Sequence, residues 1–415
     1  MTKPKFCGLI IALLAVVTLA SLVASQNNVE VKTAYTKTEF QIPMRDGVKL
    51  FTAVYTPKDT SQKYPFIMQR TPYSVSPYGP DAYKGSLGPS SLFMQEGYIF
   101  VYQDVRGRWT SGGDWYPFKY ESQDGYDSVE WAAALPYSNG KVGLWGGSYV
   151  GATQMLTAIA APPHLAGIFP VVTASNYHSH WAYQGGAFMQ LLAQAWASAL
   201  SLDTLQRRTG GSALPSHWDL LKPPSAYPLL DTGTAAGLAP YYFDWIAHPT
   251  YDDYWKQWSI EDHFEQIKVP GLHIAAWYDL FQDGSIRNYI GIKQRGGSEA
   301  ARNGQRLIIM PGGHAGNTAK IGEVDFGKDS TVDTWALGLR WYDYLLKGID
   351  NGMGSEKPVR VFVMGKNVWR EEDDWPLSRT KTMRYYLHSQ GKANTLNGDG
   401  ALSTTLPNNE PADKY

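Results

Sequence analysis

Short apolar runs alternate with helical stretches along most of this sequence, and no other feature restricts its fold as strongly. Runs typical of buried strands cover residues 65–69, 98–102, 141–145, 168–173, 272–277 and 306–310. Helical periodicity covers residues 127–134, 150–161, 284–293 and 332–346, with Asp127 as the expected N-cap of the first helix. Strands that alternate with helices form a mostly parallel sheet covered on both faces, so we predict the α/β class. A hairpin of residues 38–42 and 49–55 is expected before it.

The alternation stops between about residues 174 and 265, and this interruption divides the chain. The interrupting stretch is rich in aromatic residues and has a helical segment at 186–202. We interpret residues 175–265 as a helical cap inserted into a sheet domain of residues 33–174 and 266–350. Strand-like runs at 359–364 and 383–388 then predict a C-terminal β domain over residues 355–415. So few strands cannot close an independent sheet, and we expect the sequence to stop inside this domain.

The first residues predict export. A start with two lysines precedes the apolar run 9–19, and small residues follow it, so residues 1–25 are expected to be a signal peptide cleaved near Ser25 or Gln26. An uncleaved anchor is the alternative. We therefore expect a secreted or periplasmic protein with no membrane association after signal removal. The only cysteine, Cys7, lies in this segment, which excludes disulfides and thiolate chemistry from the mature chain.

Composition narrows the choice of partners. The formal net charge is -1 and no basic cluster interleaved with aromatics occurs, so nucleic acid is not an expected partner. The 15 tryptophans indicate aromatic packing in cores and interfaces, and also allow an aromatic-lined pocket for a bulky acyl or aryl group. Nothing in the sequence decides the oligomeric state, and a homo-oligomer stays open.

A glycine-rich turn, Gly146-Gly147-Ser148-Tyr149-Val150-Gly151, lies between a predicted strand and a predicted helix. Such a turn is typical of a nucleophile elbow, although its second glycine comes one residue later than in G-x-S-x-G. At the start of a helix, Ser148 would have backbone N–H groups and the helix dipole nearby to stabilise a developing oxyanion. A mere packing turn is the alternative. A dinucleotide-binding turn is disfavoured because the spacing G-x-G-x-x-G is missing.

Two further polar residues follow predicted strands. Asp279 comes after the run 272–277, and His314 comes shortly after the run 306–310. Carboxyl ends of parallel strands share one edge, which is where α/β sheets place their sites. The chain order Ser, Asp, His is that of the α/β-hydrolases. We therefore predict that His314 takes the proton of Ser148 while Asp279 orients the imidazole, with no cofactor and no metal.

Other residues compete for these roles. Asp283, in the turn before a helix, is the alternative acid. Among the histidines that compete with His314, His263 and His273 precede the acid, and His164, after Pro162-Pro163, is interpreted as structural. His178 and His180 lie in the cap, where they are interpreted as structural, with contact to the substrate as the alternative. His388 lies in the C-terminal domain.

Several ordered motifs between about residues 38 and 390 carry a resemblance to a known family. They are Met44-Arg45-Asp46-Gly47-Val48, Arg70-Thr71-Pro72-Tyr73, Gln103-Asp104-Val105-Arg106-Gly107-Arg108, Ser111-Gly112-Gly113, Asp124-Gly125-Tyr126-Asp127, Ser138-Asn139-Gly140-Lys141-Val142-Gly143, the turn of residues 146–151 and Trp277-Tyr278-Asp279. On these motifs the chain resembles the cocaine-esterase-like and X-prolyl dipeptidyl-peptidase superfamily of serine hydrolases. In that family the second glycine of the nucleophile turn is expected at the later position, where this chain has Gly151.

The resemblance implies an α/β-hydrolase domain, a helical cap and a C-terminal jelly roll, of which residues 359–388 would be the beginning. It assigns the triad to Ser148, Asp279 and His314. It also implies an oxyanion hole made by the Tyr73 hydroxyl and the Tyr149 backbone N–H. A buried structural tyrosine is the alternative for Tyr73.

The activity implied is hydrolysis of a small-molecule carboxylic ester or small amide. The related α-amino-acid ester hydrolases carry carboxylates just after the triad acid, where this chain has Leu280, Phe281 and Gln282, so an apolar acyl or aryl pocket fits better. An X-prolyl dipeptidyl peptidase is the alternative and would need a carboxylate in the cap; the candidates are Asp231, Asp244, Asp252 and Asp253. A catalytically silent binding protein on the same fold is the alternative from another class.

Overall fold

The computed structural model describes residues 31–210, 237–314 and 316–414, and the chain divides after Glu371 into two compact units. The predicted signal peptide and Asp231 lie outside the described residues. Within those ranges, none of the helices combines the length and apolar character that crossing a bilayer requires.

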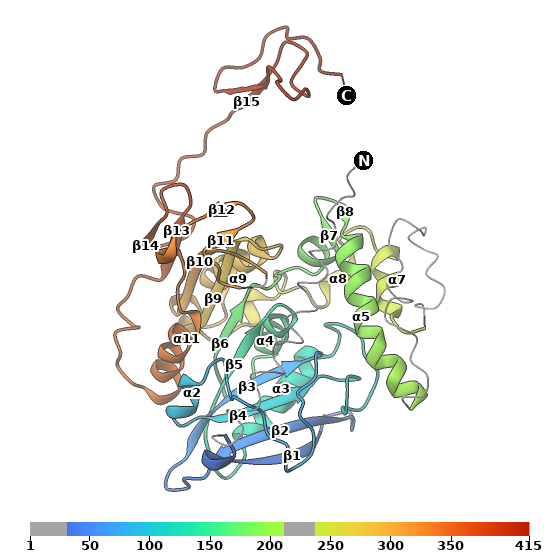
Figure 1. The fold of residues 1–415 in the computed structure, drawn as a ribbon, viewed down its shortest axis with the longest axis vertical. Coiled ribbons are helices and arrows are strands. Elements are labelled where there is room, and N and C mark those ends of the chain that lie inside the picture. Colours follow the sequence, from blue (N-terminus) through green and yellow to red (C-terminus); the bar gives the residue numbers. More distant parts are fainter. Residues whose placement is uncertain (1–30, 211–236, 315, 415) are drawn as a thin grey trace. The chain divides into compact units, whose positions relative to one another are not determined.

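The first unit is built on a ten-stranded sheet in the order β1-β2-β4-β3-β5-β6-β9-β10-β13-β14 (Figure 1). The strands are β1 (Tyr35–Pro43), β2 (Lys49–Pro57), β3 (Tyr64–Thr71), β4 (Ile99–Asp104), β5 (Ser138–Gly147), β6 (Leu165–Val171), β9 (Gly271–Tyr278), β10 (Gln305–Gly313), β13 (Val359–Val363) and β14 (Val368–Glu372). The first pairings, β1 with β2 and β2 with β4, are antiparallel. From β4 to β13 every pairing is parallel. The predicted hairpin and parallel sheet are confirmed.

Helices cover both faces of this sheet. They are α2 (Leu92–Gln95), α3 (Glu121–Ala133), α4 (Tyr149–Ile159), α9 (Gln282–Arg295), α10 (Glu299–Asn303) and α11 (Thr334–Tyr342), which continues as a π-helical turn at Asp343–Lys347. Alternate side chains of a strand enter different cores. In β3, Phe66 and Met68 pack with α3 and α4, whereas Ile67 packs with α11. Central strands such as β3 and β4 are buried on both sides, which explains their almost continuous apolar sequence.

The segment between β6 and β9 contains the predicted cap. Its described elements are a π-helical turn at His178–Ala182, the short strands β7 (Tyr183–Gln184) and β8 (Ala187–Phe188), the helices α5 (Gln190–Thr209), α7 (Pro240–Ala247) and α8 (Asp253–Lys256), and a 3-10 turn at Phe264–Gln266. Buried aromatic side chains of this segment, among them Trp181, Tyr241 and Trp245, belong to the same hydrophobic cluster as α3 and α4. The abundant tryptophan therefore fills the contact between cap and sheet domain.

Two predicted helix starts were wrong. The first helix begins at Glu121, and Asp127 does not cap it. The Asp127 carboxylate instead accepts from the backbone N–H and the side chain of Arg45, in the turn after β1. The cap helix begins at Gln190, because Gly185 and Gly186 have positive φ angles of 58° and 85° and form the turn between β7 and β8. Each start depends on a contact or turn that helical periodicity does not contain.

A third difference concerns residues 359–364, which we expected to open the C-terminal domain. Their strand, β13, pairs with β10 through Leu307 and Val359 and so extends the central sheet. The physical reason is an apolar edge: Val359, Val361 and Phe362 are buried there. The second unit, Glu372–Tyr415, contains a small hairpin of β15 (Tyr386–His388) and β16 (Ala401–Ser403).

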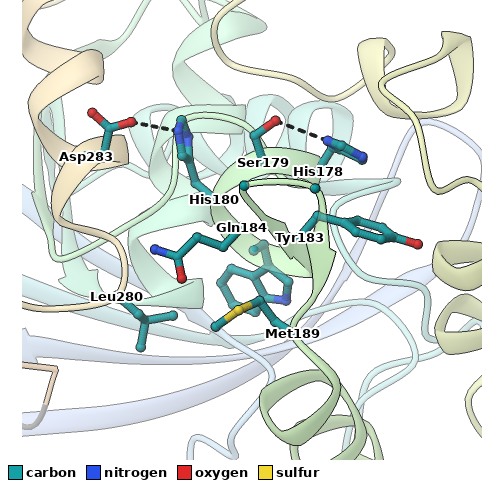
Figure 2. A pocket seen from close by; sticks show the side chains of 11 residues that line it. His178, Ser179, His180, Tyr183, Gln184, Met189, Leu280 and Asp283 are labelled. Atoms are coloured by element: carbon teal, nitrogen blue, oxygen red, sulfur yellow. Dashed lines mark hydrogen bonds and ion pairs between the residues drawn. The ribbon is translucent and has the colours of Figure 1, made fainter. Parts of the chain in front are cut away.

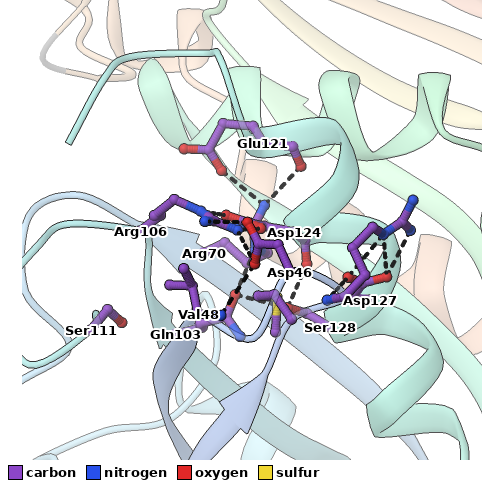
Figure 3. Close-up of polar contacts among 12 residues, drawn as sticks. Asp46, Val48, Arg70, Gln103, Arg106, Ser111, Glu121, Asp124, Asp127 and Ser128 are labelled. Atoms are coloured by element: carbon purple, nitrogen blue, oxygen red, sulfur yellow. Dashed lines mark hydrogen bonds and ion pairs between the residues drawn. The ribbon is translucent and has the colours of Figure 1, made fainter. Parts of the chain in front are cut away.

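Arginine-carboxylate pairs tie the turn after β1 to the end of β4 and to α3. Arg106, only 8% exposed, contacts Asp46 and Asp124, each at 2.6 Å (Figure 3). A buried guanidinium is tolerated only when charges of opposite sign satisfy it. Three motifs that carried the family resemblance therefore meet in one polar cluster.

Burial of a neutral histidine predicts loss of stability in acid. His273 in β9 is 1% exposed and its Nε2 lies 2.8 Å from Gln305 Oε1, and burial lowers the pKa of its imidazole from 6.5 to about 4. The unfolded chain takes up this proton near pH 6.5, so stability present above that pH is lost as the pH falls through about 4. We predict a loss of about 3 kcal/mol in unfolding free energy between pH 7 and pH 4 from this group.

Urea unfolding at a series of pH values measures this loss, and His273→Gln should flatten the dependence. His164→Gln, at a half-exposed histidine, is the matched control and should not. The same pH dependence of the unfolding free energy in wild type and His273→Gln would contradict the role of His273.

Candidate active site

Three strand ends bring the predicted triad together. Ser148 follows β5, Asp279 follows β9 and His314 follows β10. Tyr278 and Gly313 are partners in the register of β9 and β10, so the acid and the histidine leave the sheet side by side. This is the edge of the sheet where the sequence placed them.

A strained turn presents Ser148. Its φ of 59° and ψ of -126° lie in a region that residues other than glycine rarely adopt. Its backbone N–H donates to Val171 O at 2.9 Å, which fixes the turn against β6. Gly146, with φ 138°, has no room for a side chain, because a Cβ there would lie 2.3 Å from Val150 Cγ1. Strand and helix can meet this closely only with glycine at that position.

The three polar side chains form one hydrogen-bonded series. His314 Nε2 lies 2.9 Å from Ser148 Oγ, and His314 Nδ1 lies 2.7 Å from Asp279 Oδ1. The Asp279 carboxylate is buried, and its second oxygen accepts from Phe281 N at 3.1 Å. A carboxylate fixed in this way holds the proton on Nδ1, so that Nε2 is left to accept the serine proton.

The alternative acid has other partners. Asp283 contacts His180 Nε2 at 2.9 Å and Arg287 Nε at 2.7 Å, and 57% of its side chain is exposed. The geometry therefore favours Asp279 as the partner of His314.

Two groups near Ser148 can donate to an oxyanion. The N–H of Tyr149 is the first of helix α4, where backbone donors have no acceptor within the helix. Tyr73 lies just beyond β3, and desolvation raises the pKa of its hydroxyl to about 12, against the hydrogen bond from Trp196, the charge of Arg108 and the neighbouring Ser148 hydroxyl. The side chain is 43% exposed, and the raised pKa means that the hydroxyl keeps its proton at neutral pH.

The side chain of Tyr149 anchors the start of α4. Its hydroxyl donates to Glu121 Oε1 at 2.9 Å and accepts from Phe118 N at the same distance. The Glu121 carboxylate forms an ion pair of 2.9 Å with Arg70, which lies in β3 (Figure 3). Burial raises the pKa of both Tyr149 and Glu121. Sequence reasoning did not identify Glu121 or Arg70 as supports of this helix start, because only the fold brings them together.

A cavity of about 360 Å³ lies between the cap and the loop after β9 (Figure 2). Leu280, which directly follows the acid, and Met189 give it apolar walls, whereas His180 and Asp283 give it a polar end. Burial lowers the pKa of His180, against the charges of Glu261 and Asp283. Phe281 is not among the residues that line this cavity. It is buried, with its ring 4.8 Å from that of Trp181 and 5.2 Å from that of His314.

The cap carboxylates that can be described have partners of their own. Asp244 accepts from Tyr116, Asp252 caps α8 and pairs with His248, and Asp253 pairs with Lys256. In residues 31–210, 237–314 and 316–414, no group of three or more His, Cys, Asp and Glu side chains is arranged to hold a metal ion.

Comparisons with known proteins agree with this geometry. A model of the X-Pro dipeptidyl-peptidase (S15) family matches residues 46–316, and a model of the X-Pro dipeptidyl-peptidase C-terminal non-catalytic domain matches residues 351–415. Cocaine esterase from Rhodococcus sp. (strain MB1 Bresler) is 29% identical over 90% of this chain and 66% of its own length.

Two solved structures are also similar. An aminopeptidase from the marine sediment archaeon Thaumarchaeota archaeon has a TM-score of 0.71 and 25% identity, covering 91% of this chain and 63% of its own. An α-amino acid ester hydrolase has a TM-score of 0.69 and 25% identity, covering 91% and 64%.

Fold and site together define an α/β-hydrolase. The chain belongs to the X-Pro dipeptidyl-peptidase (S15) family, within the superfamily that includes cocaine esterase. It spans about two thirds of the length of the relatives named above, at 66%, 63% and 64%. The match to the C-terminal domain family begins at residue 351, before β13. In the structure, however, β13 and β14 are part of the central sheet.

We predict that Gly146→Ala destabilises the protein by about 2 kcal/mol or more, because a side chain there combines an unfavourable φ with a clash against Val150. Ser148 should also react more slowly with a fluorophosphonate. Gly140→Ala is the matched control, since Gly140 lies in the same strand with φ 83° but a Cβ there would approach nothing closer than 3.8 Å. Chemical denaturation and labelling rates measure both effects, and equal behaviour of the two variants would contradict the argument.

Proposed function

We propose that this protein hydrolyses a carboxylic ester or small amide through an acyl-enzyme on Ser148. The hydrogen-bonded series of Ser148, His314 and Asp279 at one edge of the sheet is the observation that carries the proposal. Its similarity to cocaine esterase and to an α-amino acid ester hydrolase supports ester chemistry.

In the first step, Ser148 Oγ attacks the substrate carbonyl carbon while its proton moves to His314 Nε2. The carbonyl oxygen becomes an oxyanion, which accepts from the Tyr73 hydroxyl and the Tyr149 N–H. Asp279 stabilises the imidazolium that forms. The intermediate then expels the alcohol or amine, which takes the proton from His314, and the acyl group stays on Ser148.

In the second step, His314 takes a proton from water, and the resulting hydroxide attacks the acyl carbonyl. The same two groups donate hydrogen bonds to the second oxyanion. Collapse of this intermediate returns the proton to Ser148 Oγ and releases the carboxylic acid. Each step uses the one histidine first as base and then as acid.

Cleavage of Xaa-Pro peptides is the second candidate. It requires an anionic partner for the peptide α-amino group. Asp283 is a carboxylate in the cavity wall, just after the loop that carries Asp279, where it also contacts His180 and Arg287. Membership of the X-Pro dipeptidyl-peptidase (S15) family and similarity to the archaeal aminopeptidase agree with this candidate.

A panel of aryl esters and Xaa-Pro anilides tests both candidates. We predict that wild type is labelled by a fluorophosphonate and that Ser148→Ala loses labelling and turnover, on the order of 10⁶-fold in kcat. Ser61→Ala is the control, because Ser61 is exposed just before the amino end of β3, whereas Ser148 follows the carboxyl end of β5. Faster cleavage of the anilides would favour the peptidase, and no labelling of wild type would leave a silent binding protein.

Export is part of this proposal, because the apolar run 9–19 and the small residues after it have the pattern of a signal peptide. Expression of the full sequence in a secreting host should give a mature protein that begins near Ser25 or Gln26. Intact mass and N-terminal sequencing measure the cleavage. A chain that keeps its first 25 residues and stays with the membrane would instead indicate an anchor.

A further inference from the structure

The cap helix α5 contributes a hydrogen-bond donor to the edge that carries Ser148. Trp196 Nε1 donates to the Tyr73 hydroxyl oxygen at 3.0 Å. An indole N–H only donates, so the phenol oxygen is the acceptor and its single hydrogen remains for another acceptor. The Ser148 hydroxyl is a further polar neighbour of this phenol. The contact from the cap therefore leaves the phenolic hydrogen for the side where the reacting carbonyl oxygen would lie.

The same indole also packs against the side chain of Tyr149, the residue whose backbone N–H is the second proposed oxyanion donor. Its ring stacks on that of Tyr149, with centroids 5.8 Å apart and an interplanar angle of 28°. The ring of Trp245 also stacks on the indole of Trp196, with centroids 6.1 Å apart and an interplanar angle of 21°. One side chain of the cap thus touches Tyr73 through its N–H and Tyr149 through its ring.

A buried arginine fixes this part of α5 against the sheet domain. Arg108 is 1% exposed; its Nε donates to Pro72 O at 3.0 Å and its Nη1 donates to Leu200 O at 2.7 Å. Pro72 immediately precedes Tyr73, and Leu200 lies four residues after Trp196, on the same side of the helix. Two connections one turn apart therefore join α5 to the segment of Tyr73, which leaves the indole little freedom to move.

We propose that Trp196 is a positioning residue for the oxyanion hole, an inference that rests on the proposed function. Its N–H orients the Tyr73 hydroxyl toward the developing oxyanion. It also strengthens that donor, because hydrogen bonds in series polarise one another by roughly 10–30% per bond. The cap thereby takes part in transition-state stabilisation as well as in enclosing the substrate.

A double-mutant cycle with Trp196→Phe and Tyr73→Phe tests this role on an aryl ester. Tyr73→Phe removes an oxyanion donor and should lower kcat about 10²-fold or more. Trp196→Phe keeps an aromatic ring but loses the N–H, and should lower kcat about tenfold with KM nearly unchanged. In the Tyr73→Phe background, Trp196→Phe should change kcat less than about twofold, because the hydroxyl through which it acts is gone.

Trp245→Phe is the matched control, since it alters the same aromatic stack without touching the hydrogen bond to Tyr73, and it should keep the wild-type kcat. Thermal unfolding checks that every variant folds. Equal losses from Trp196→Phe in both backgrounds would overturn the role of Trp196, as would a loss that changes with the size of the acyl group. Absence of wild-type turnover would reject the proposed function and this role with it. Additive losses with turnover intact would reject the role of Trp196 alone.

Discussion

Parallel pairing of the strands from β4 to β13 is the constraint on which the site depends. Asp279 and His314 are 35 residues apart in the sequence, yet they leave neighbouring strands together because Tyr278 and Gly313 are partners in the register. A slip of one residue in β9 would turn its side chains to the opposite faces and move the carboxylate out of reach of the imidazole. Apolar cores on both faces hold the register, since a slip would also bring buried side chains into the wrong core.

Much of this arrangement follows from local sequence. Continuous apolar runs mark strands that are buried on both faces, and a residue directly after such a run must lie at the carboxyl edge of a parallel sheet. Strand position alone therefore predicts that Ser148, Asp279 and His314 lie at the same edge of the sheet. Tyr73 is different. Nothing in its neighbourhood marks it as a donor, and it was assigned only because the motif around it resembles that of a family.

The features that sequence could not give all depend on contacts between distant segments. Helix α3 begins without a side-chain cap, and the carboxylate of Asp127, the expected cap, instead accepts from Arg45. Placement of β13 depends on an open edge of β10, which is a property of the sheet and not of residues 359–363. Trp196 is an ordinary aromatic residue of an amphipathic helix until the docking of α5 brings it to Tyr73.

Two sets of contacts hold the two proposed oxyanion donors, and each includes a buried arginine, while Trp196 of the cap contacts both tyrosines. Arg70 and Glu121 support Tyr149 from within the sheet domain, whereas Arg108 ties the segment of Tyr73 to the cap. Buried charges of this kind add little net stability compared with apolar packing, so their main effect is to fix geometry. Fixed donors need no reorganisation when charge develops on a substrate. Because one set belongs to the sheet domain and the other reaches the cap, the geometry of the site depends on the docking of α5 as much as on the register of the strands.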